Sequence, residues 1–342
     1  MIRYAIDHGV NYIDTAYTYN DGNSELVVGK ALAGNYQKKA KVATKLPVHL
    51  VEDKSDLDRI LETQLSRLDS DHVDFYLFHS LNKELWDKIK AFDMLEWAKT
   101  NLAKGKIKHL GFSFHDSFEV FKDIVDSFNE WEFCQIQYNY LDENYQAGKA
   151  GLHYAASKGL AVSIMEPLAA GTLAVNPPSD IQKIWDSCKI KRTPVQWALG
   201  WVWNHPEVSV ALSGMNSMEQ VRENIQAAKY SDEKFTVPEL GLVSEAASLY
   251  AKCGFIGCTK CRYCSHCPQS VAIPDILALL NKLSAAKRRG MQVQDDLKEF
   301  YQKSIPLAKW ARNCVKCGLC EQRCPQHLPV RKLLSEATSS FE

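Results

Sequence analysis

Residues Lys41 to His79 contain the stretch of sequence that decides the fold. It begins with K-V-A-T-K at 41–45, continues with S-D-L-D-R-I-L-E-T-Q-L-S-R-L at 55–68 and ends with V-D-F-Y-L-F-H at 73–79. The two outer runs are short and rich in β-branched and aromatic residues, whereas the middle run has apolar residues at helical spacing. A strand, a helix and a second strand in this order predict two parallel strands joined by a crossover helix.

The same alternation continues over the first two thirds of the chain. Further helical patterns occur at Ile2 to His8, Lys83 to Lys104 and Pro194 to Asn204. A closed barrel needs eight strands, and the missing one would lie upstream of residue 1 unless the barrel is completed in another way. We therefore predict an α/β fold, a TIM-type (β/α)8 barrel that lacks its first strand. Seven runs have the pattern of strands: Asn11 to Thr15, Lys41 to Lys45, Val73 to His79, Ile107 to Ser113, Phe133 to Gln137, Ala161 to Met165 and Val208 to Ser213.

The alternation ends after Asn224 to Tyr230. A helical connector at Leu240 to Lys252 leads into a region without strand patterns, where Ile273 to Tyr301 has helical spacing interrupted at Gly290. We predict a barrel domain over residues 1–235 and a small α-helical domain over residues 236–342. A core this small needs additional stabilisation.

Eight cysteines form two clusters in this region, and each cluster ends in Cys-Pro. The second cluster has the spacing C-x2-C-x2-C-x3-C-P of bacterial ferredoxins, in which three cysteines bind one [4Fe-4S] cube and the fourth binds the other cube. The first cluster differs by one residue, C-x2-C-x2-C-x2-C-P. This predicts a ferredoxin-like domain with two cubes, one bound by Cys258, Cys261, Cys264 and Cys324 and the other by Cys314, Cys317, Cys320 and Cys267.

Zinc and disulfides are the alternatives for these cysteines. Zinc uses two C-x2-C pairs per ion, which leaves the third cysteine at the same spacing unexplained. Disulfide scaffolds are typically short secreted chains, whereas this chain has 342 residues and opens without a basic and then apolar leader. We therefore expect a cytoplasmic protein with reduced cysteines. The remaining Cys134, Cys188 and Cys253 are expected to pack in the interior, with Cys253 a candidate for a spare ligand.

The composition is that of an ordinary globular enzyme of two domains, with 46% hydrophobic and 24% charged residues. Because the formal net charge is zero, the chain lacks the basic excess typical of nucleic-acid binding. The basic run Lys287 to Arg289 before Gly290 is interpreted as the C-terminus of a helix. No apolar stretch is long enough to span a membrane. We expect neither nucleic acid nor a membrane as a partner.

Polar residues follow the first three predicted strands. Asp14, Lys45 and His79 each end a strand run, and Tyr19 lies five residues after Asp14. In a parallel barrel these strand ends share one rim, where barrel enzymes assemble their active sites. The alternative for each residue is structural, because an Asp at a strand end often caps a helix and a single His is often a satisfied hydrogen-bonding partner.

Together, these residues and their surroundings resemble the aldo-keto reductase family. The resemblance covers roughly the first two thirds of the chain and, with the cysteine-rich tail, the chain is similar to the branch that carries a C-terminal 4Fe-4S dicluster domain. Eight motifs carry the resemblance: D-T-A-Y-T-Y at 14–19, G-N-S-E at 22–25, T-K at 44–45, Y-L-F-H at 76–79, G-F-S at 111–113, Q-I-Q-Y-N at 135–139, M-E-P-L-A-A-G-T-L at 165–173 and S-G-M-N-S-M-E-Q-V-R-E-N at 213–224.

The resemblance implies an NAD(P)H-dependent oxidoreductase acting on a small carbonyl or alcohol substrate. Tyr19 would donate a proton to the carbonyl oxygen as the nicotinamide delivers hydride to the carbon. The unperturbed pKa of a tyrosine is about 10, and a cationic Lys45 would bring it toward neutrality while Asp14 holds the ammonium and His79 orients the carbonyl.

The resemblance also implies cofactor contacts, with some departures from the family pattern. The usual Asn after Ser113 is Phe114, and the aromatic residue that stacks on the nicotinamide is Met165. The Lys and Arg that commonly hold a 2'-phosphate align with Gly214 and Gln220, which leaves NADPH and NADH both open, with Arg222 a possible substitute. The backbone N-H groups of 168–173 would bind the pyrophosphate. The implied contacts are Ser113, Gln135, Met165, Pro167, Leu168, Gly171, Leu173, Ser213, Gly214, Gln220, Glu223 and Asn224.

Two classes of function remain open at this point. The first is an active reductase tethered to two clusters, which would serve electron transfer to a redox partner protein, redox sensing or structural support. The second is a ferredoxin-like electron carrier or interaction protein whose incomplete barrel is catalytically inactive, because a missing strand leaves two sheet edges unpaired. Nicotinamide binding distinguishes the two.

Overall fold

A computed structural model describes residues 1–252, 255–258, 261–288 and 292–342. The chain divides into two compact units, of which the first comprises Met1–Pro167 and Ala198–Phe235 and the second Leu168–Trp197 and Thr236–Glu342. The second unit therefore includes residues 168–197, which the predicted barrel domain contains. These residues form helix α8 (Ser179–Ser187), which packs against α11 (Val237–Ala251) of the same unit.

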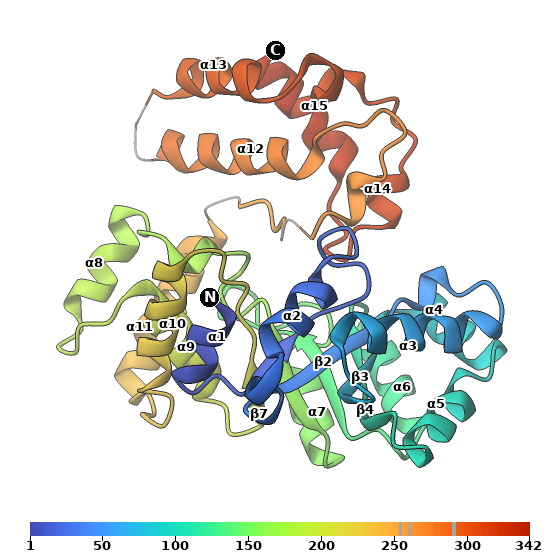
Figure 1. Cartoon of the computed structure of the whole chain (residues 1–342). Helices are drawn as coiled ribbons and strands as arrows, with labels where there is room; N and C mark the ends of the chain where they lie inside the picture. Colours follow the sequence, from blue (N-terminus) through green and yellow to red (C-terminus); the bar gives the residue numbers. More distant parts are fainter. Residues whose placement is uncertain (253–254, 259–260, 289–291) are drawn as a thin grey trace. The chain divides into compact units, whose positions relative to one another are not determined.

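The first unit is built on one parallel sheet with strand order β1-β2-β3-β4-β5-β6-β7. Figure 1 labels β2, β3, β4 and β7 of this sheet. The sheet curls into an open half-barrel, and each predicted strand run corresponds to an observed strand. The α/β prediction and the seven strands are thus confirmed. Their bounds are β1 (Tyr12–Asp14), β2 (Lys41–Leu46), β3 (Val73–Leu81), β4 (Ile107–Phe114), β5 (Phe133–Gln137), β6 (Ala161–Met165) and β7 (Val208–Ala211).

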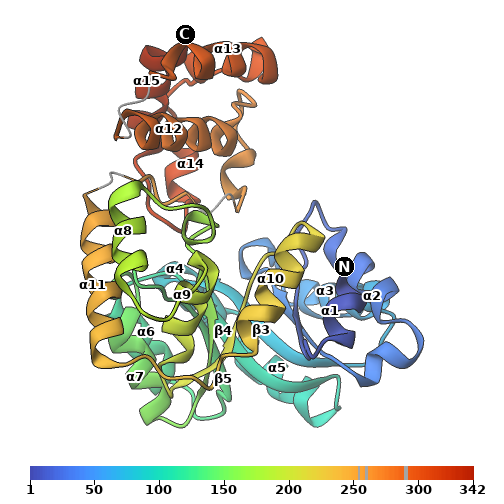
Figure 2. The same ribbon diagram turned by 90° about the vertical axis from the view of Figure 1, so that its left-hand side faces the viewer.

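Helices connect consecutive strands and cover the outside of the sheet (Figure 2). One helical prediction was wrong, because residues 83–104 form two helices and not one. The break is at Asp93, which has a left-handed backbone conformation with φ 53°, and Asp tolerates that region better than most residues. The helices are α1 (Ile2–Asp7), α2 (Ser24–Leu32), α3 (Ser55–Leu68), α4 (Lys83–Ala91), α5 (Met94–Ala103), α6 (Phe118–Asp126), α7 (Gly148–Ser157), α9 (Pro194–Trp203), which crosses the boundary between the units, and α10 (Met218–Ala228).

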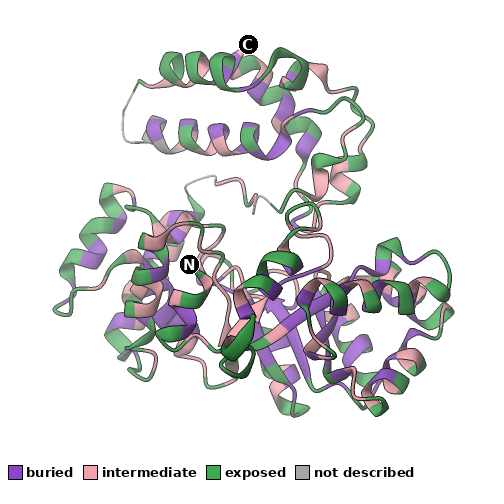
Figure 3. Cartoon of the chain, viewed as in Figure 1, coloured by how far each residue is buried: buried purple, intermediate pink, exposed green. Residues whose placement is uncertain are grey.

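The strands of this unit consist largely of buried residues, as their purple colour in Figure 3 shows. In β3, residues such as Tyr76, Leu77 and Phe78 are all fully buried, as expected for a parallel strand covered on both sides. Helix α3 buries one face, with Leu57, Ile60, Leu61, Gln64, Leu65 and Leu68 inside. This packing holds β2 and β3, and the polar residues at their ends, in a rigid scaffold.

Strands β1 and β7 are the two ends of the sheet in the described part of the chain. Helices α1 and α10 contact each other, and the guanidinium carbon of Arg222 lies 5.8 Å from the Tyr4 ring centroid. Contact between these helices joins the segments that carry the two end strands. The expectation of a further strand upstream of residue 1 stays a prediction.

The second unit is helical in its described residues. A cluster of buried residues from α12, α13 and α15, including Leu277, Leu280, Tyr301, Leu334 and Phe341, forms its core, and several cysteines pack against this core. In the described residues no helix is both long and apolar enough to cross a membrane. Besides α8 and α11, the unit contains η3 (Thr172–Ala174), η4 (Tyr263–Ser265), α12 (Ile273–Arg288), α13 (Gln294–Ser304), η5 (Leu307–Lys309), η6 (Ala311–Asn313), α14 (Leu319–Gln322) and α15 (Val330–Phe341).

The cysteines outside the two clusters have different positions. Cys134 and Cys188 are buried, in agreement with a packing role. Cys253 lies outside the described residues, as do Arg289 and Gly290 of the basic run.

Candidate functional site

Four polar residues from the first three strands and their loops converge in the first unit. The Nζ atom of Lys45 on β2 donates hydrogen bonds to Oδ1 of Asp14 at the end of β1, at 2.5 Å, and to the carbonyl of Thr15, at 2.8 Å. The same Nζ lies 4.9 Å from the centroid of the Tyr19 ring. The Tyr19 ring is 5.7 Å from the His79 ring, with an edge-to-face angle of 73°. The structure therefore brings Asp14, Tyr19, Lys45 and His79 together.

Burial determines the charge states in this cluster. The Lys45 side chain is fully buried, and its ion pair with Asp14 compensates the cost of removing both charges from water. Burial raises the pKa of Asp14, and the Lys45 ammonium opposes this effect. The pKa of His79 is well below 6.5, first because the ring is buried and second because Lys45 is nearby. His79 is therefore a neutral imidazole at physiological pH, able to donate one hydrogen bond.

An irregularity in β3 lies next to His79. The register with β4 shifts between Phe78 and Leu81. Ser80 within the shift has a left-handed backbone with φ 58°, and its N-H donates a 2.7 Å hydrogen bond to Oγ of Ser113. Bulges of this kind commonly redirect side chains near active sites. Here the bulge ties the strand that carries His79 to the strand that carries Ser113.

A row of buried polar side chains extends from Ser113 across the next two strands. Ser113 on β4 pairs with Gln135 on β5, and Gln135 pairs with Ser163 on β6. The Oε1 atom of Gln135 and the Oγ atom of Ser163 are buried and lack hydrogen-bond partners, while Nε2 of Gln135 contacts the Met165 sulfur at 3.9 Å. A buried polar group normally has a partner. An amide-bearing ligand such as a nicotinamide carboxamide fits the chemistry of this row.

Ser163 is a candidate site residue that the sequence pattern did not indicate. The run A-V-S-I-M at 161–165 contains one polar residue among apolar ones, and this pattern alone also fits a serine packed in the core. Only the strand register shows that Ser163 lies beside Gln135.

A second buried polar network supports Lys45 from behind. Gln64 on α3 donates to Oε1 of Glu25 at 2.9 Å and to the Lys45 carbonyl at 3.0 Å, and accepts from the Tyr76 hydroxyl at 2.7 Å. Glu25 is fully buried and pairs with Arg67 at 3.1 Å. The network connects α2, α3, β2 and β3. Through the hydrogen bond from Gln64 to the Lys45 carbonyl, the network holds the backbone of Lys45 in place.

The predicted cofactor residues at and after the end of β6 belong to two different units. Met165 and Pro167 belong to the first unit, and the segment Leu168–Trp197 belongs to the second. Met165 is partly buried at the end of β6, and Pro167 is buried. In the second unit, the N-H groups of Gly171 and Leu173 donate to the Leu168 carbonyl at 3.0 and 3.1 Å. Those two amides are thus engaged within the loop, which differs from the expectation that they face a pyrophosphate.

The segment after β7 contains the remaining predicted cofactor residues. Ser213, Glu223 and Asn224 are partly buried, whereas Gly214 and Gln220 are exposed. The Asn224 amide donates to the Gln220 carbonyl at 2.8 Å, and its buried Oδ1 lacks a partner. Arg222 lies over Tyr4, so its side chain is engaged with α1.

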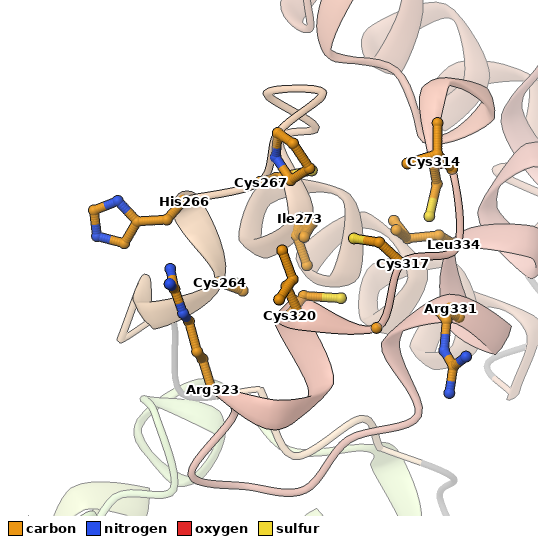
Figure 4. Close-up of a pocket in the computed structure, with 14 residues that line it drawn as sticks. Cys264, His266, Cys267, Ile273, Cys314, Cys317, Cys320, Arg323, Arg331 and Leu334 are labelled. Carbon is orange, nitrogen blue, oxygen red and sulfur yellow. The ribbon is translucent and has the colours of Figure 1, made fainter. Parts of the chain in front are cut away.

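The eight clustered cysteines line two pockets in the second unit. One pocket is lined by Cys258, Cys261, Cys264 and Cys324, and the other by Cys267, Cys314, Cys317 and Cys320, with Cys264 at the edge of both. Figure 4 shows the cysteines of the second pocket. Each run thus supplies three cysteines to one pocket and its last cysteine to the other. The pocket linings group the cysteines as the sequence prediction does, and four thiols around one pocket fit a [4Fe-4S] cube. Which cysteines bind which cube stays a prediction.

In the described ranges no group of three or more His, Cys, Asp and Glu side chains is arranged to hold a single metal ion. A cube differs from a single ion because each cysteine binds a different iron, so the sulfurs are farther apart. Burial raises the pKa of the Cys264 thiol to about 12. A cube bound there would require Cys264 as a thiolate and would supply the compensating positive charge.

Comparisons with known proteins agree with this arrangement. Residues 1–237 match the model of the aldo/keto reductase family, and residues 257–328 match the model of a 4Fe-4S dicluster domain. An uncharacterized oxidoreductase, YrpG, from Bacillus subtilis is 26% identical over 67% of this chain and 81% of its own length. The NADH-specific methylglyoxal reductase of Escherichia coli is 27% identical over 64% of this chain and 78% of its own length.

A solved structure of an aldo-keto reductase from Klebsiella pneumoniae in complex with NADPH is similar to this chain with a TM-score of 0.58. It is 28% identical, and the match covers 73% of this chain and 83% of that one. The family model covers more than half of the residues, from the strand that carries Asp14 to the helix that carries Asn224. The chain therefore belongs to the aldo/keto reductase family of oxidoreductases, with a 4Fe-4S dicluster domain indicated after the half-barrel.

Proposed function

We propose that the first unit catalyses NAD(P)H-dependent reduction of a small carbonyl compound, or the reverse oxidation of an alcohol. The observation that carries this proposal is the position of the Lys45 ammonium, 2.5 Å from Asp14 and 4.9 Å from the Tyr19 ring. Asp14 holds Lys45 in place, and the ammonium stabilises the phenolate form of Tyr19. Tyr19 is then the general acid that gives its proton to the carbonyl oxygen.

His79 has a positioning role in this proposal. Because its pKa is well below 6.5, the ring stays neutral and donates one hydrogen bond to the substrate oxygen without competing as an acid. Its edge-to-face contact with Tyr19 supports a common substrate oxygen as the acceptor of both donors. Two donors at one oxygen stabilise the charge that develops there.

A nicotinamide cofactor would supply the hydride for this chemistry. Ser113 and Gln135 would hold its carboxamide, with Ser163 beside them, and Met165 would cover the ring. Ser213, Gly214, Gln220, Glu223 and Asn224 would bind the adenosine end. Gln135 Oε1, Ser163 Oγ and Asn224 Oδ1 support this assignment because they are buried and lack partners.

We further propose that the second unit holds two [4Fe-4S] clusters, in the cysteine grouping of the two pockets. Each cluster exchanges one electron, whereas a nicotinamide exchanges hydride, a two-electron unit. In this proposal the clusters exchange single electrons with a redox partner protein. A reduced intracellular compartment, the cytoplasm, suits both the clusters and the thiols.

The test uses anaerobically purified full-length protein. Iron and acid-labile sulfide are measured first, and two clusters predict about eight irons per chain. NADH and NADPH are then titrated into wild type and Tyr19→Phe. We expect the variant to keep the cofactor Kd and to lose at least about 100-fold in turnover. Substantial carbonyl reduction by Tyr19→Phe would remove Tyr19 from the acid role.

The alternative function is that of an electron carrier with an inactive half-barrel. This alternative is supported by the open sheet, because β1 and β7 are the two end strands of the sheet in the described residues. Intact clusters without saturable nicotinamide binding would support this alternative. Binding of NADH or NADPH in the micromolar range would exclude it.

A further inference from the structure

The pocket around Cys317 has an unusual surface. Cys317 itself is exposed, and the side chains of Val315 and Leu319 on either side of it are 60% and 39% exposed. Both residues line the pocket of Cys267, Cys314, Cys317 and Cys320. Of the large exposed hydrophobic residues among those the structure describes, these two alone line either cysteine pocket. We name this surface the Cys317 patch. It comprises the pocket-lining residues Val315, Cys317, Leu319, Arg323 and Arg331 and the exposed Lys316, which precedes Cys317 in the sequence.

The charge around this patch differs from that of the whole chain. Residues 305–332 contain six Lys and Arg but one acidic residue, whereas the whole chain has equal numbers of basic and acidic residues. Arg323 and Arg331 line the pocket, as Figure 4 shows, and Lys316 lies between Val315 and Cys317. Lys316, Arg323 and Arg331 are all exposed. The patch therefore has an apolar centre and a basic rim.

The single acidic residue of the segment reduces this charge only in part. Glu321 accepts a 2.8 Å hydrogen bond from Nε of Arg331, which orients Arg331 and neutralises it. Lys316 and Arg323 have no ion pair within the described ranges. Lys316 and Arg323 thus have no carboxylate partner among the described residues.

Compensation of thiolate charge is the simpler explanation for the cations, because a cube with four cysteinates is negative. It does not explain the exposed Val315 and Leu319. Small apolar areas with a charged rim are typical of weak, transient protein interfaces, including those of electron-transfer proteins. Opposite charges across such an interface increase the association rate.

We propose that the Cys317 patch is the docking surface for an acidic protein that carries a one-electron centre. The proposal deepens the proposed function and rests on it for the cluster beneath the patch. Docking there brings the partner to the exposed cysteine ligand, which shortens the path of the electron. The other pocket contributes no comparable exposed apolar pair in the described residues.

The test measures binding of two acidic probes, a flavodoxin and a bacterial two-cluster ferredoxin, to anaerobic full-length protein by calorimetry. Binding is measured at about 20 and at about 200 mM NaCl, because salt screens exposed charges and therefore weakens the electrostatic part of the binding. We expect binding to weaken with salt and Lys316→Glu/Arg323→Glu to weaken it at least tenfold at low salt. Val315→Ser is expected to weaken binding at both salt concentrations. Lys303→Glu, an exposed charge reversal on α13, is the matched control and should leave binding unchanged.

Each variant is first analysed for iron and sulfide, so that loss of a cluster is separated from loss of docking. A wild type without iron contradicts the cluster proposal, whatever the binding result. An iron-replete double variant that binds both probes like wild type overturns the docking proposal. So does failure of wild type to bind either probe, or equal binding of α-lactalbumin, an acidic protein without a redox centre.

Discussion

Lys45 Nζ lies 2.5 Å from Asp14 Oδ1, and the Lys45 side chain is fully buried. Removal of one partner leaves the other charge buried and uncompensated, at a cost of about 3–5 kcal/mol. We therefore expect Lys45→Met to lower the free energy of unfolding by about that amount and turnover at least about 100-fold. Urea denaturation and steady-state kinetics measure the two effects.

The double variant Asp14→Asn/Lys45→Met is the control for this prediction. It removes both charges, so most of the stability should return while turnover stays low. A double variant as unstable as Lys45→Met would show that the ion pair is not the cause.

His79 gives the unfolding free energy a dependence on pH. Its folded-state pKa is well below the ordinary value of 6.5 because of burial, so the unfolded state binds a proton first as the pH falls. The stabilisation by neutral His79 is complete above about pH 6.5 and decreases below it, by up to about 1.4 kcal/mol per pH unit. Urea denaturation between about pH 7.5 and 5.5 should show a steeper decrease for wild type than for His79→Gln. Equal slopes for the two proteins would contradict this assignment.

The two pockets predict how paired cysteine substitutions affect the clusters. Cys261 and Cys324 line one pocket, whereas Cys267 lines the other. Cys261→Ser/Cys324→Ser should damage one cluster and leave about four irons, and Cys261→Ser/Cys267→Ser should damage both. Iron analysis and electron paramagnetic resonance of reduced samples measure this. The reverse pattern would mean that each cysteine run binds its own cube.

Residues 214 and 220 determine the preference between NADPH and NADH in this proposal. A Cβ atom added at Gly214 meets no atom within 4 Å, so a side chain fits there. Gly214→Lys/Gln220→Arg should tighten NADPH binding about tenfold or more through contacts with the 2'-phosphate, with little change for NADH. Fluorescence titration with both nucleotides tests this, and equal changes for both would contradict it.

The buried hydrogen-bond network of Gln64, Glu25 and Tyr76 behind Lys45 should contribute to the free energy of unfolding. Gln64→Leu removes the hydrogen bonds to Glu25 and the Lys45 carbonyl and from Tyr76, all buried. Unsatisfied buried groups cost about 1–3 kcal/mol each, so we expect a loss of about 3 kcal/mol in the free energy of unfolding. Thr63→Ala, one position away on α3, should change it by less than about 0.5 kcal/mol.

The sequence predicted the strands well because each is a short apolar run between turn residues. The sequence predicted helix breaks and strand irregularities less well, because the local residue pattern there fits both a continuous and an interrupted element. The helical pattern at 83–104 continues through Asp93, and only the left-handed backbone at that residue shows the break into α4 and α5. The bulge in β3 could not be predicted either, because nothing in the sequence F-H-S-L at 78–81 indicates that Ser80 has a left-handed backbone conformation.

Spacing along the chain by itself identified the two cysteine clusters and predicted cube binding, because chelation of a cube requires thiols at short intervals. The order of motifs also determined the family and the α/β class. Which polar residues lie together was decided only by the tertiary structure. Asp14 and Lys45 are 31 positions apart, and Gln135 and Ser163 are 28 apart. Strand register and burial place the members of each pair side by side, and both arise from packing across the whole sheet, which no local pattern contains.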